Sequence, residues 1–330
     1  MNNAFIKAIE YYLPENTLTN NDLSAMFPEW NAGKIAKKTG IASRHVAAEN
    51  ETASDMAVKA AEKLFAAAPE LKAQVDFVLF CTQSPDYKLP TSACIIQKRL
   101  GLNKNMGATD YNLGCSGFVY GLMLAKGLIV SQIAKNVLLL TAETYTKYCH
   151  EKDKGNRSIF GDGAAATLVS TEGFAEIKNF AFGTDGEGED NLKVKTGGAR
   201  FPEKENTFAL DGGGYVNAPD FLYMNGPEIF NFTLDVVPEL SAKCLKNNGL
   251  TKDEIDYYVF HQANKYMLET LRTVMEIDKE KFYVNLSDIG NTVSSTIPIA
   301  IKNAEISSNK NVMIAGFGVG YSYAACVLKF

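Results

Sequence analysis

Residues 74–83, QVDFVLFCTQ, and residues 254–263, EIDYYVFHQA, decide the fold because they are two copies of one pattern. Each copy has an acidic residue, four apolar residues and then a polar turn. Two further pairs of segments repeat in the same way: FGDGAAATLV from residue 160 with FGVGYSYAACVL from residue 317, and DYNLGCSG from residue 110 with YVNLSDIGN from residue 283. The copies are separated by roughly half of the chain, which is far more than the period of a solenoid repeat. The sequence therefore predicts a duplicated α/β unit.

Strands and helices are predicted to alternate within each half. Apolar runs such as residues 136–143 are typical of buried strands. Residues 52–68 have the apolar spacing of an amphipathic helix with Thr52 or Ser54 as its N-cap, and a second helix is predicted to end at Gly101. This alternation favours a mixed sheet with helices on both faces. Two such halves packed together give a layered αβαβα architecture.

The two halves are predicted to comprise residues 1–172 and 173–330. No Pro/Ser-rich linker separates them, so we expect one compact body. Residues 183–225 are rich in glycine and charge. They predict a surface excursion with hairpin character.

Composition excludes several classes of protein. Of 330 residues, 46% are hydrophobic and 22% are charged, as in ordinary globular proteins, and the net charge is −5. A nucleic-acid-binding surface needs clustered positive charge, so none is expected. The first residues lack the basic, apolar and small-residue pattern of a signal peptide, which predicts a cytoplasmic protein. The apolar stretch 117–133 contains Lys126 and glycines and therefore predicts a helix buried on all sides rather than a membrane span.

Cysteine and histidine usage excludes a metal site. The six cysteines include no C-x-x-C pair, and no His/Cys cluster has the spacing of zinc ligands. We interpret the cysteines as reduced thiols and expect no metal. The chain has only three histidines, His45, His150 and His261, so cysteine chemistry that needs an imidazole has few candidates.

Cys115 is the candidate nucleophile. It lies between two glycines in YNLGCSGF, residues 111–118, where a strand is predicted to lead into the apolar helix. A partly buried helix N-terminus is worth up to ~2 kcal/mol to an anion, which predicts a thiol pKa near ~7 instead of ~8.5. The flanking glycines would let a substrate approach the backbone closely. The alternative is a cysteine that serves only as core packing.

His261 and Asn291 are the candidate partners of Cys115. His261 follows a predicted strand, and strand ends are where α/β folds place their chemistry. The duplication puts His261 where Cys81 stands in the first half, and it puts the Asn291 segment opposite the Cys115 segment. The alternatives are a hydrogen-bonded core histidine and a turn-forming asparagine.

Seven segments carry a resemblance to a known family. They are YYLPENTLTNNDL, KKTGIASRH, YNLGCSGF, IFGDGAAA, FHQANKYML, GNTVSSTIP and GFGVGYSYAA, and their order and spacing cover nearly the whole chain. In these segments the chain resembles β-ketoacyl-acyl-carrier-protein synthase III of the thiolase superfamily. The resemblance implies a thiolase-like fold made of two duplicated halves and an active site of Cys115, His261 and Asn291.

The resemblance also implies a reaction. Cys115 takes the acyl group of an acyl-CoA, a malonyl thioester on acyl-carrier protein loses CO₂, and the enolate condenses with the acyl-cysteine to a 3-oxoacyl product. His261 and Asn291 would donate hydrogen bonds to the oxygen that becomes the enolate. No bound cofactor is implied, since the coenzyme A thioester is a substrate. A homodimer is expected, formed near residues 81–101.

Further site residues follow from the same resemblance. The backbone N–H groups of Cys115 and Val319 would form the oxyanion hole, with Gly318 as the less favoured register, and Phe317 would wall the acyl pocket. The entrance for coenzyme A and carrier would be formed by four side chains: Trp30, Lys38, Lys154 and Arg157. Trp30 lies upstream of its expected place and lysines replace two usual arginines, which leaves the coenzyme A contacts and the acyl primer open.

Other functions remain to be weighed. A degradative thiolase would need a second cysteine in the last glycine-rich loop, whereas Cys326 falls beyond it. A non-condensing acyltransferase, which would move the acyl group to a hydroxyl or amine, could use the same cysteine. A papain-like hydrolase is disfavoured by the apolar surroundings of Cys115, and an inactive interaction subunit by the complete set of three site residues.

Overall fold

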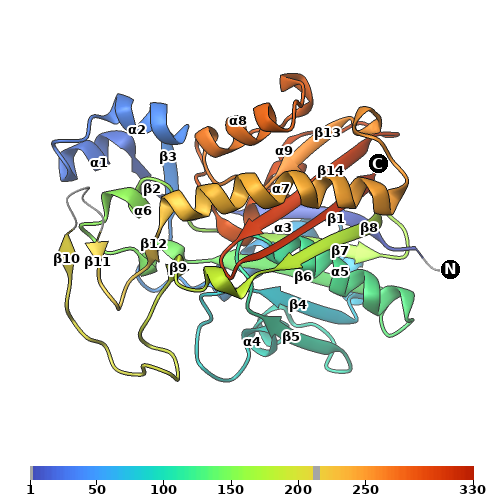
Figure 1. Ribbon diagram of the computed structural model, residues 1–330. Helices are drawn as coiled ribbons and strands as arrows, with labels where there is room; N and C mark the ends of the chain where they lie inside the picture. The colour runs from blue at the N-terminus through green and yellow to red at the C-terminus, as the bar shows by residue number, and fades with distance from the viewer. Residues whose placement is uncertain (1–2, 211–215) are drawn as a thin grey trace.

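The computed structural model describes residues 3–210 and 216–330 and is built around one mixed sheet (Figure 1). The strand order is β13-β14-β15-β8-β1-β7-β6-β4-β5. The first half supplies β1 (Phe5–Tyr12), β4 (Phe77–Cys81), β5 (Gly107–Tyr111), β6 (Asn136–Glu143) and β7 (Gly163–Ser170). The second half supplies β8 (Ala175–Thr184), β13 (Tyr257–Phe260), β14 (Asn311–Gly318) and β15 (Ser322–Lys329).

Strand pairing confirms the duplication. β4 runs parallel to β6 and β6 runs antiparallel to β7, and β13, β14 and β15 repeat these directions. The parallel bridge between Tyr258 and Phe282 stands where a counterpart of β5 would pair. The halves join where β1 meets β8 over two residue pairs, Phe5 with Glu176 and Ile6 with Ala175. The two copied segments that end at Cys81 and His261 therefore occupy equivalent strands.

The helices form three layers around the two half-sheets. α3 (Ala53–Ala67) and α4 (Ser92–Leu100) cover the first half, and α7 (Gly226–Asn248) and α8 (Lys265–Val274) cover the second. Between them lie α5 (Gly117–Val130) and α9 (Thr296–Asn303), which contact strands of both halves. Three clusters of buried apolar side chains fill the spaces between these layers. The predicted αβαβα layering is confirmed.

Local signals in the sequence explain where two of these helices begin and end. Thr52 caps α3: its hydroxyl accepts from the N–H of Asp55, and its own N–H donates to the Asp55 carboxylate at 2.7 Å. This reciprocal pair selects Thr52 over Ser54 as the cap. α4 ends at Gly101, whose φ of 60° lies in the left-handed region that favours glycine.

The remaining elements surround one end of the sheet. They are β2 (Asn16–Thr19), α1 (Asn20–Met26), α2 (Ala32–Thr39), β3 (Ser43–Val46) and α6 (Lys154–Arg157). Short 3-10 turns occur elsewhere along the chain, at Pro69–Gln74, Tyr145–Tyr148, Gly186–Gly188, Lys252–Glu254, Lys279–Lys281 and Val293–Ser295. The excursion at 183–225 contains two small ladders, β9 (Leu192–Lys193) with β12 (Tyr223–Met224) and β10 (Ala209–Leu210) with β11 (Val216–Asn217). Its predicted hairpin character is confirmed within the described residues.

The prediction that residues 117–133 are buried on all sides is wrong. Strands of both halves pack against the helix, but Leu124 and Val130 are 36% and 41% exposed, and Ile133, just after the helix, is 69% exposed. An apolar stretch contains no positional signal that separates its covered side from its open one, because both are apolar. In the ranges 3–210 and 216–330, no helix combines the length and the apolar character needed to cross a membrane.

Candidate active site

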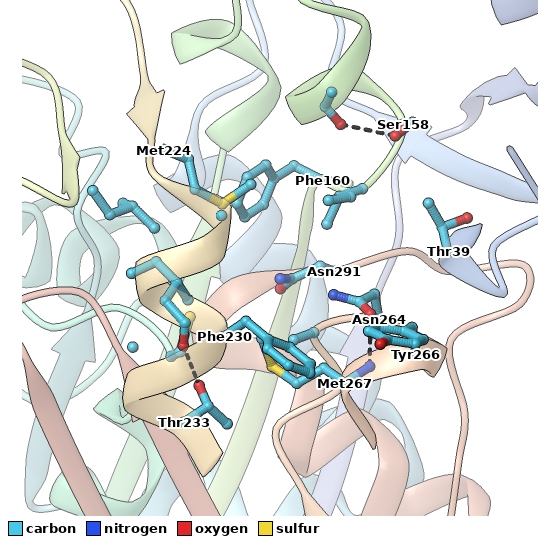
Figure 2. Close-up of a pocket in the computed structure, with 18 of the residues that line it drawn as sticks. Thr39, Ser158, Phe160, Met224, Phe230, Thr233, Asn264, Tyr266, Met267 and Asn291 are labelled. Carbon is cyan, nitrogen blue, oxygen red and sulfur yellow. Dashed lines mark hydrogen bonds between the residues drawn. The ribbon is translucent and has the colours of Figure 1, made fainter. Parts of the chain in front are cut away.

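A cavity of about 450 Å³ opens between the two halves of the chain. Cys115, His261 and Asn291 all line it, although they come from segments far apart in the sequence. In Figure 2, Asn291 lies in the middle of the site, between Phe160 on one side and Phe230 with Met267 on the other. The structure thus brings together three polar groups in an otherwise mostly apolar cavity.

Cys115 lies just before α5, whose first residue is Gly117 and whose N-cap is Ser116. Its side chain is buried, with 9% of its surface exposed. The flanking glycines are required by packing: a Cβ on Gly117 would lie 2.3 Å from the sulfur of Cys81, and one on Gly114 would lie 2.6 Å from Oε1 of Gln83. Gly114 and Gly117 therefore let the nucleophile loop pack closely, a role that the sequence reasoning had assigned to substrate approach.

Burial determines the acidity of the thiol. Desolvation, together with the Glu143 carboxyl, raises the pKa of Cys115 to about 12. The predicted pKa near neutrality is wrong, because it counted the helix terminus and not the loss of water around the sulfur. Glu143 is itself fully buried, and desolvation raises its pKa to about 8 although its oxygens accept hydrogen bonds from the N–H of Gln83 and the hydroxyl of Ser84.

His261 follows β13 directly, and hydrogen bonds hold both its backbone and its imidazole ring. Its backbone N–H donates to the carbonyl of Ala315 at 2.8 Å, which ties it to β14. Its ring Nδ1 lies 2.7 Å from Oγ1 of Thr296, the first residue of α9. Burial lowers the pKa of His261 to about 3, so the imidazole is neutral at physiological pH.

Asn291 is held by its backbone and by its side chain. Its N–H donates to the carbonyl of Ile159 at 2.9 Å, and its carbonyl accepts from the N–H of Gly161 at 3.0 Å. Its side-chain Oδ1 accepts from the N–H of Val293 at 2.9 Å. With Oδ1 engaged in this way, Nδ2 is left as a donor that has no acceptor among the described residues, on a side chain that lines the cavity. Val293 has a φ of 55°, an unfavourable conformation for a β-branched residue and one that clusters at functional sites.

The loop after β14 lies against the nucleophile. Gly318 is the last residue of β14 and pairs with Ser322, and a Cβ on it would lie 3.0 Å from the sulfur of Cys115. Val319 lies beyond the strand. Among the described residues, the backbone N–H groups of Cys115 and Val319 have no oxygen acceptor in the protein. Phe317, also predicted, is buried and packs with its ring 5.8 Å from the ring of His261.

The predicted entrance residues are brought together only in part. Trp30 and Lys38 line the cavity, and Nζ of Lys38 lies 5.9 Å from the centre of the Trp30 ring. Lys154 lies at the same distance from that ring and forms an ion pair with Glu29. Neither Lys154 nor Arg157 lines the cavity itself.

Arg157 packs on α1 instead, with Nη2 3.7 Å from the sulfur of Met26. It occupies the last position of the four-residue helix α6, which points its side chain toward α1 rather than toward the cavity. Its assignment to the entrance rested on closeness in sequence to Lys154. Closeness in sequence does not imply a shared direction along a helix.

The start of α7 supplies cavity residues that the sequence reasoning missed. Ile229, Phe230 and Thr233 line the cavity from this helix, and Tyr266 of α8 stacks on Phe230 with ring centres 5.4 Å apart. The excursion at 183–225 also reaches the site through Met224. The available signal was Asn225 followed by Gly-Pro, which marks a helix start next to the site. Among the described residues, no cluster of three His, Cys, Asp or Glu side chains could hold a metal ion.

Comparisons with known proteins point to one family. Residues 109–186 match the family model described as 3-oxoacyl-acyl-carrier-protein synthase III, and residues 245–330 match its C-terminal counterpart. The chain is 36% identical to β-ketoacyl-acyl-carrier-protein synthase III of Chlamydia caviae, over 99% of this chain and 96% of that protein. It is also 36% identical to synthase III 2 of Halalkalibacterium halodurans, over 99% of this chain and 96% of that protein.

Solved structures are similar over the same length. A 3-oxoacyl-acyl-carrier-protein synthase III is 49% identical with a TM-score of 0.97, covering 99% of this chain and all of the other. A synthase from Burkholderia xenovorans is 33% identical with a TM-score of 0.89, covering 99% of this chain and 93% of the other. These relatives support a condensing reaction over the alternative of non-condensing acyl transfer. The chain belongs to the β-ketoacyl-acyl-carrier-protein synthase III family and is a condensing enzyme of the acyltransferase class.

Proposed function

We propose that this enzyme loads an acyl group from an acyl-CoA onto Cys115 and condenses it with malonyl-acyl-carrier protein. The observation that supports this most directly is that Cys115, His261 and Asn291 line one cavity. The relatives are named for a 3-oxoacyl product on acyl-carrier protein, which fits a cysteine able to hold the primer. In the first stage the Cys115 sulfur attacks the thioester carbonyl, the C–S bond to coenzyme A breaks, and coenzyme A leaves as a thiol.

The oxyanion of this stage needs two hydrogen-bond donors. We assign them to the backbone N–H groups of Cys115 and Val319, which have no oxygen acceptor among the described residues. Gly318 is the weaker candidate because it pairs with Ser322 in the β14–β15 ladder. Removing one such donor typically costs about 2.7–4 kcal/mol of transition-state stabilisation. Phe317 walls the acyl pocket beside this loop.

In the second stage the malonyl thioester loses CO₂. The bond between its carboxylate carbon and its methylene carbon breaks, and the electron pair moves into an enolate whose oxygen needs a donor. The Nδ2 of Asn291 is suited to this role because Oδ1 is engaged by Val293. His261 is the second polar group of the site. The enolate carbon then attacks the acyl-cysteine carbonyl, releasing the 3-oxoacyl product, and the Cys115 thiolate takes up a proton.

The entrance for coenzyme A and for the carrier lies at Trp30 and Lys38, with Lys154 beside them. Both ligands bring phosphate on a pantetheine arm, and a protein with a net charge of −5 attracts phosphate only through a local cluster of positive charge. Nζ of Lys38 and Nζ of Lys154 each lie 5.9 Å from the centre of the Trp30 ring, so two ammonium groups lie near one aromatic side chain. The acyl-CoA serves as substrate, and no resident cofactor enters the proposed reaction.

A homodimer formed near residues 81–101 completes the proposal. Tyr87 and Leu89 are 62% and 82% exposed in the single chain, an unusual placement for large apolar side chains. They precede α4, which packs on β5, and β5 is an edge strand of the sheet that is available to pair with a second copy. Light scattering at micromolar concentration should give twice the mass of one chain, and a monomer would contradict this. The cytoplasmic location and the division at residues 172 and 173 stay predictions.

The proposed function is tested by incubating the enzyme with a panel of acyl-CoA thioesters and measuring intact mass. We expect one acyl adduct per chain, and peptide mapping should place it on Cys115. Cys115→Ser should lose the adduct, and Cys81→Ser is the matched control because Cys81 is also a buried cysteine. An adduct on Cys81 or Cys149 would refute the assignment. The best adduct also identifies the primer.

A further inference from the structure

We propose that Asn191 is a positioning residue that holds Tyr321 and so fixes the turn that carries the Val319 N–H. Its consequence rests on the proposed function, because it concerns the oxyanion that forms when Cys115 is acylated. The contacts that carry the inference do not depend on that function. Asn191 lies outside all seven segments that resemble the family, so neither the motifs nor the duplication predicts a role for it.

The turn at residues 319–321 joins β14 to β15 and lies against the nucleophile loop. A Cβ on Gly114 would lie 3.1 Å from Cγ1 of Val319, so the two loops are in close contact. Within the part of the chain that the structure describes, Tyr321 is the one residue of this turn with backbone hydrogen bonds. Its carbonyl accepts from the N–H of Asp185 at 3.0 Å, and its N–H donates to the carbonyl of Asp185. The position of the Val319 N–H therefore depends on how firmly Tyr321 is held.

The side chain of Tyr321 is held along its ring and at its tip. The ring is 6% exposed and stacks on Phe232 of α7 with ring centres 3.8 Å apart. A Cβ on Gly188 would lie 2.4 Å from the same ring, so the excursion at 183–225 encloses it from another side. At the tip, the Tyr321 hydroxyl accepts a hydrogen bond from Nδ2 of Asn191 at 2.7 Å.

Asn191 uses every polar atom that it has. Its backbone N–H donates to the carbonyl of Gly188 at 3.0 Å, and its carbonyl accepts from the N–H of Asn225 at 2.8 Å. Its Oδ1 accepts from Nδ2 of Asn225 at 3.2 Å, while its Nδ2 donates to Tyr321. An amide with both ends engaged has one preferred orientation. Asn191 therefore presents a fixed donor to the Tyr321 hydroxyl.

The same asparagine is attached to the wall of the cavity. Leu192 and Met224 pair across the β9–β12 ladder, and both line the cavity. Asn191 directly precedes this ladder, and Asn225 directly follows it and caps α7. Figure 2 shows Met224 beside the helix that carries Phe230. The hydrogen bonds of Asn191 thus fix the turn after β14 relative to the wall that faces the substrate.

This arrangement has a consequence for one step of the reaction. A donor of an oxyanion hole is effective when it lies about 2.7–3.1 Å from the oxyanion, so a loosened turn weakens the contribution of Val319. Alkylation of Cys115 by iodoacetamide provides a comparison, because the sulfur forms a C–S bond, iodide leaves and no oxyanion forms. Decarboxylation of malonyl-acyl-carrier protein is a second comparison, because its enolate is assigned to Asn291. Loss of the Asn191 contact should therefore slow acylation selectively.

Two variants test the contact from its two ends. Asn191→Leu and Tyr321→Phe each remove the hydrogen bond, and each should lower the rate of acylation at saturating acyl-CoA about 3- to 10-fold. The Michaelis constant, the rate of alkylation by iodoacetamide and the rate of decarboxylation should not change. The double variant should be no slower than the slower single variant, because both substitutions remove the same contact. Additive losses, an unchanged acylation rate in both single variants, or an equal loss in alkylation or decarboxylation would overturn the proposal.

Two further variants separate positioning from general stability. Asn191→Asp should restore acylation, because a phenol hydroxyl can donate to a carboxylate as well as accept from an amide. Tyr258→Phe is the matched control, since Tyr258 is 1% exposed and its hydroxyl donates to the carbonyl of Lys252 at 3.3 Å, on another element. It should leave acylation unchanged, and a loss like that of Tyr321→Phe would contradict the assignment.

The proposal can fail separately from the proposed function. If the wild type forms no acyl adduct, the proposed function is refuted. The unfolding equilibria of the two single variants and the double variant in urea then still decide whether Asn191 holds Tyr321, because a shared contact makes their effects non-additive. If Asn191→Leu does not fold, Tyr321→Phe and Asn191→Asp decide by their rates of acylation against alkylation.

Discussion

Gly318→Ala should inactivate the nucleophile without unfolding the protein. The added Cβ would lie 3.0 Å from the sulfur of Cys115 and 2.9 Å from its Cβ. Ordinary contacts between such atoms are about 3.5–4.0 Å, so the sulfur must move by roughly 0.5–1 Å. A displacement of about 1 Å at a reacting atom can cost about 100-fold in rate. We therefore expect the rate of acylation, measured by intact mass after rapid mixing with acyl-CoA, to fall about 100-fold, or about 2.7 kcal/mol.

Two other glycines separate this effect from a loss of stability. A Cβ on Gly316 would lie 2.6 Å from the carbonyl oxygen of Cys115 and 2.8 Å from the Cα of Ser116, which are backbone atoms that cannot rotate away. Gly316→Ala should therefore destabilise the fold, by about 1–3 kcal/mol. Gly127 in α5 has nothing within 4 Å of an added Cβ. Gly127→Ala should raise the free energy of unfolding by up to about 1 kcal/mol and leave acylation unchanged.

These three variants should differ in their free energy of unfolding. Chemical denaturation should rank Gly127→Ala above the wild type, Gly318→Ala below it and Gly316→Ala lowest, because the Cβ of Cys115 must also shift in Gly318→Ala. If Gly318→Ala acylates at the wild-type rate, the loop after β14 does not confine the sulfur, and its assignment to the oxyanion hole loses its geometric basis. If Gly318→Ala is destabilised as strongly as Gly316→Ala, its low activity would report unfolding instead of misplacement.

Three further predictions concern single polar groups. The pKa of Glu143 is about 8 in the folded protein against 4.5 for the free side chain, so the stability linked to its proton is present at low pH and is lost as pH rises through this window. In the wild type this loss should be about 1.4 kcal/mol of unfolding free energy per pH unit. Glu143→Gln should lack the loss when urea titrations at pH 5 and pH 8 are compared. Asn291→Ala should still form the acyl adduct but should lose decarboxylation of malonyl carrier by at least about 100-fold, and an equal loss of both would contradict its role at the enolate. Lys38→Ala should raise the Michaelis constant for acyl-CoA several-fold at low salt and less at high salt. The reason is that a surface charge contact is worth about 1 kcal/mol or less and is screened by salt. A change confined to the turnover number would place the entrance elsewhere.

The architecture could be predicted because its signals are local and repeated. A strand is buried along its whole length, so its apolar run is visible in the sequence at 136–143, and the second copy of each pattern supports the first. The cap at Thr52 and the end of α4 at Gly101 depend on residues within one helical turn, and both are confirmed. The open side of α5 could not be predicted, because Leu124 and Leu122 are chemically alike and only the folded chain shows which is covered.

The site could be predicted in its members but not in its environment. Cys115 was predicted from its flanking glycines before an apolar helix, and His261 and Asn291 from the duplication and the family resemblance; the structure places all three at one cavity. No motif in the sequence marks the part of α7 that lines the cavity. Its contribution depends on the position that Phe230 takes after the long excursion at 183–225. Arg157 was misplaced for the opposite reason, because a neighbour in sequence was taken as a neighbour in space.

Protonation is the property that the sequence could predict least, and it changes the chemistry most. The cavity that excludes water raises the pKa of the Cys115 thiol to about 12 and lowers that of His261 to about 3, so both groups are neutral in the resting site. A neutral pair is the state that a dry apolar cavity stabilises, because separated charges there lose their hydration. In the proposed reaction, charge would then develop together with the attack on the thioester, when the oxyanion meets the N–H groups assigned to it. Formation of the nucleophile is thereby coupled to the arrival of its substrate, and a helix terminus alone could not impose that coupling.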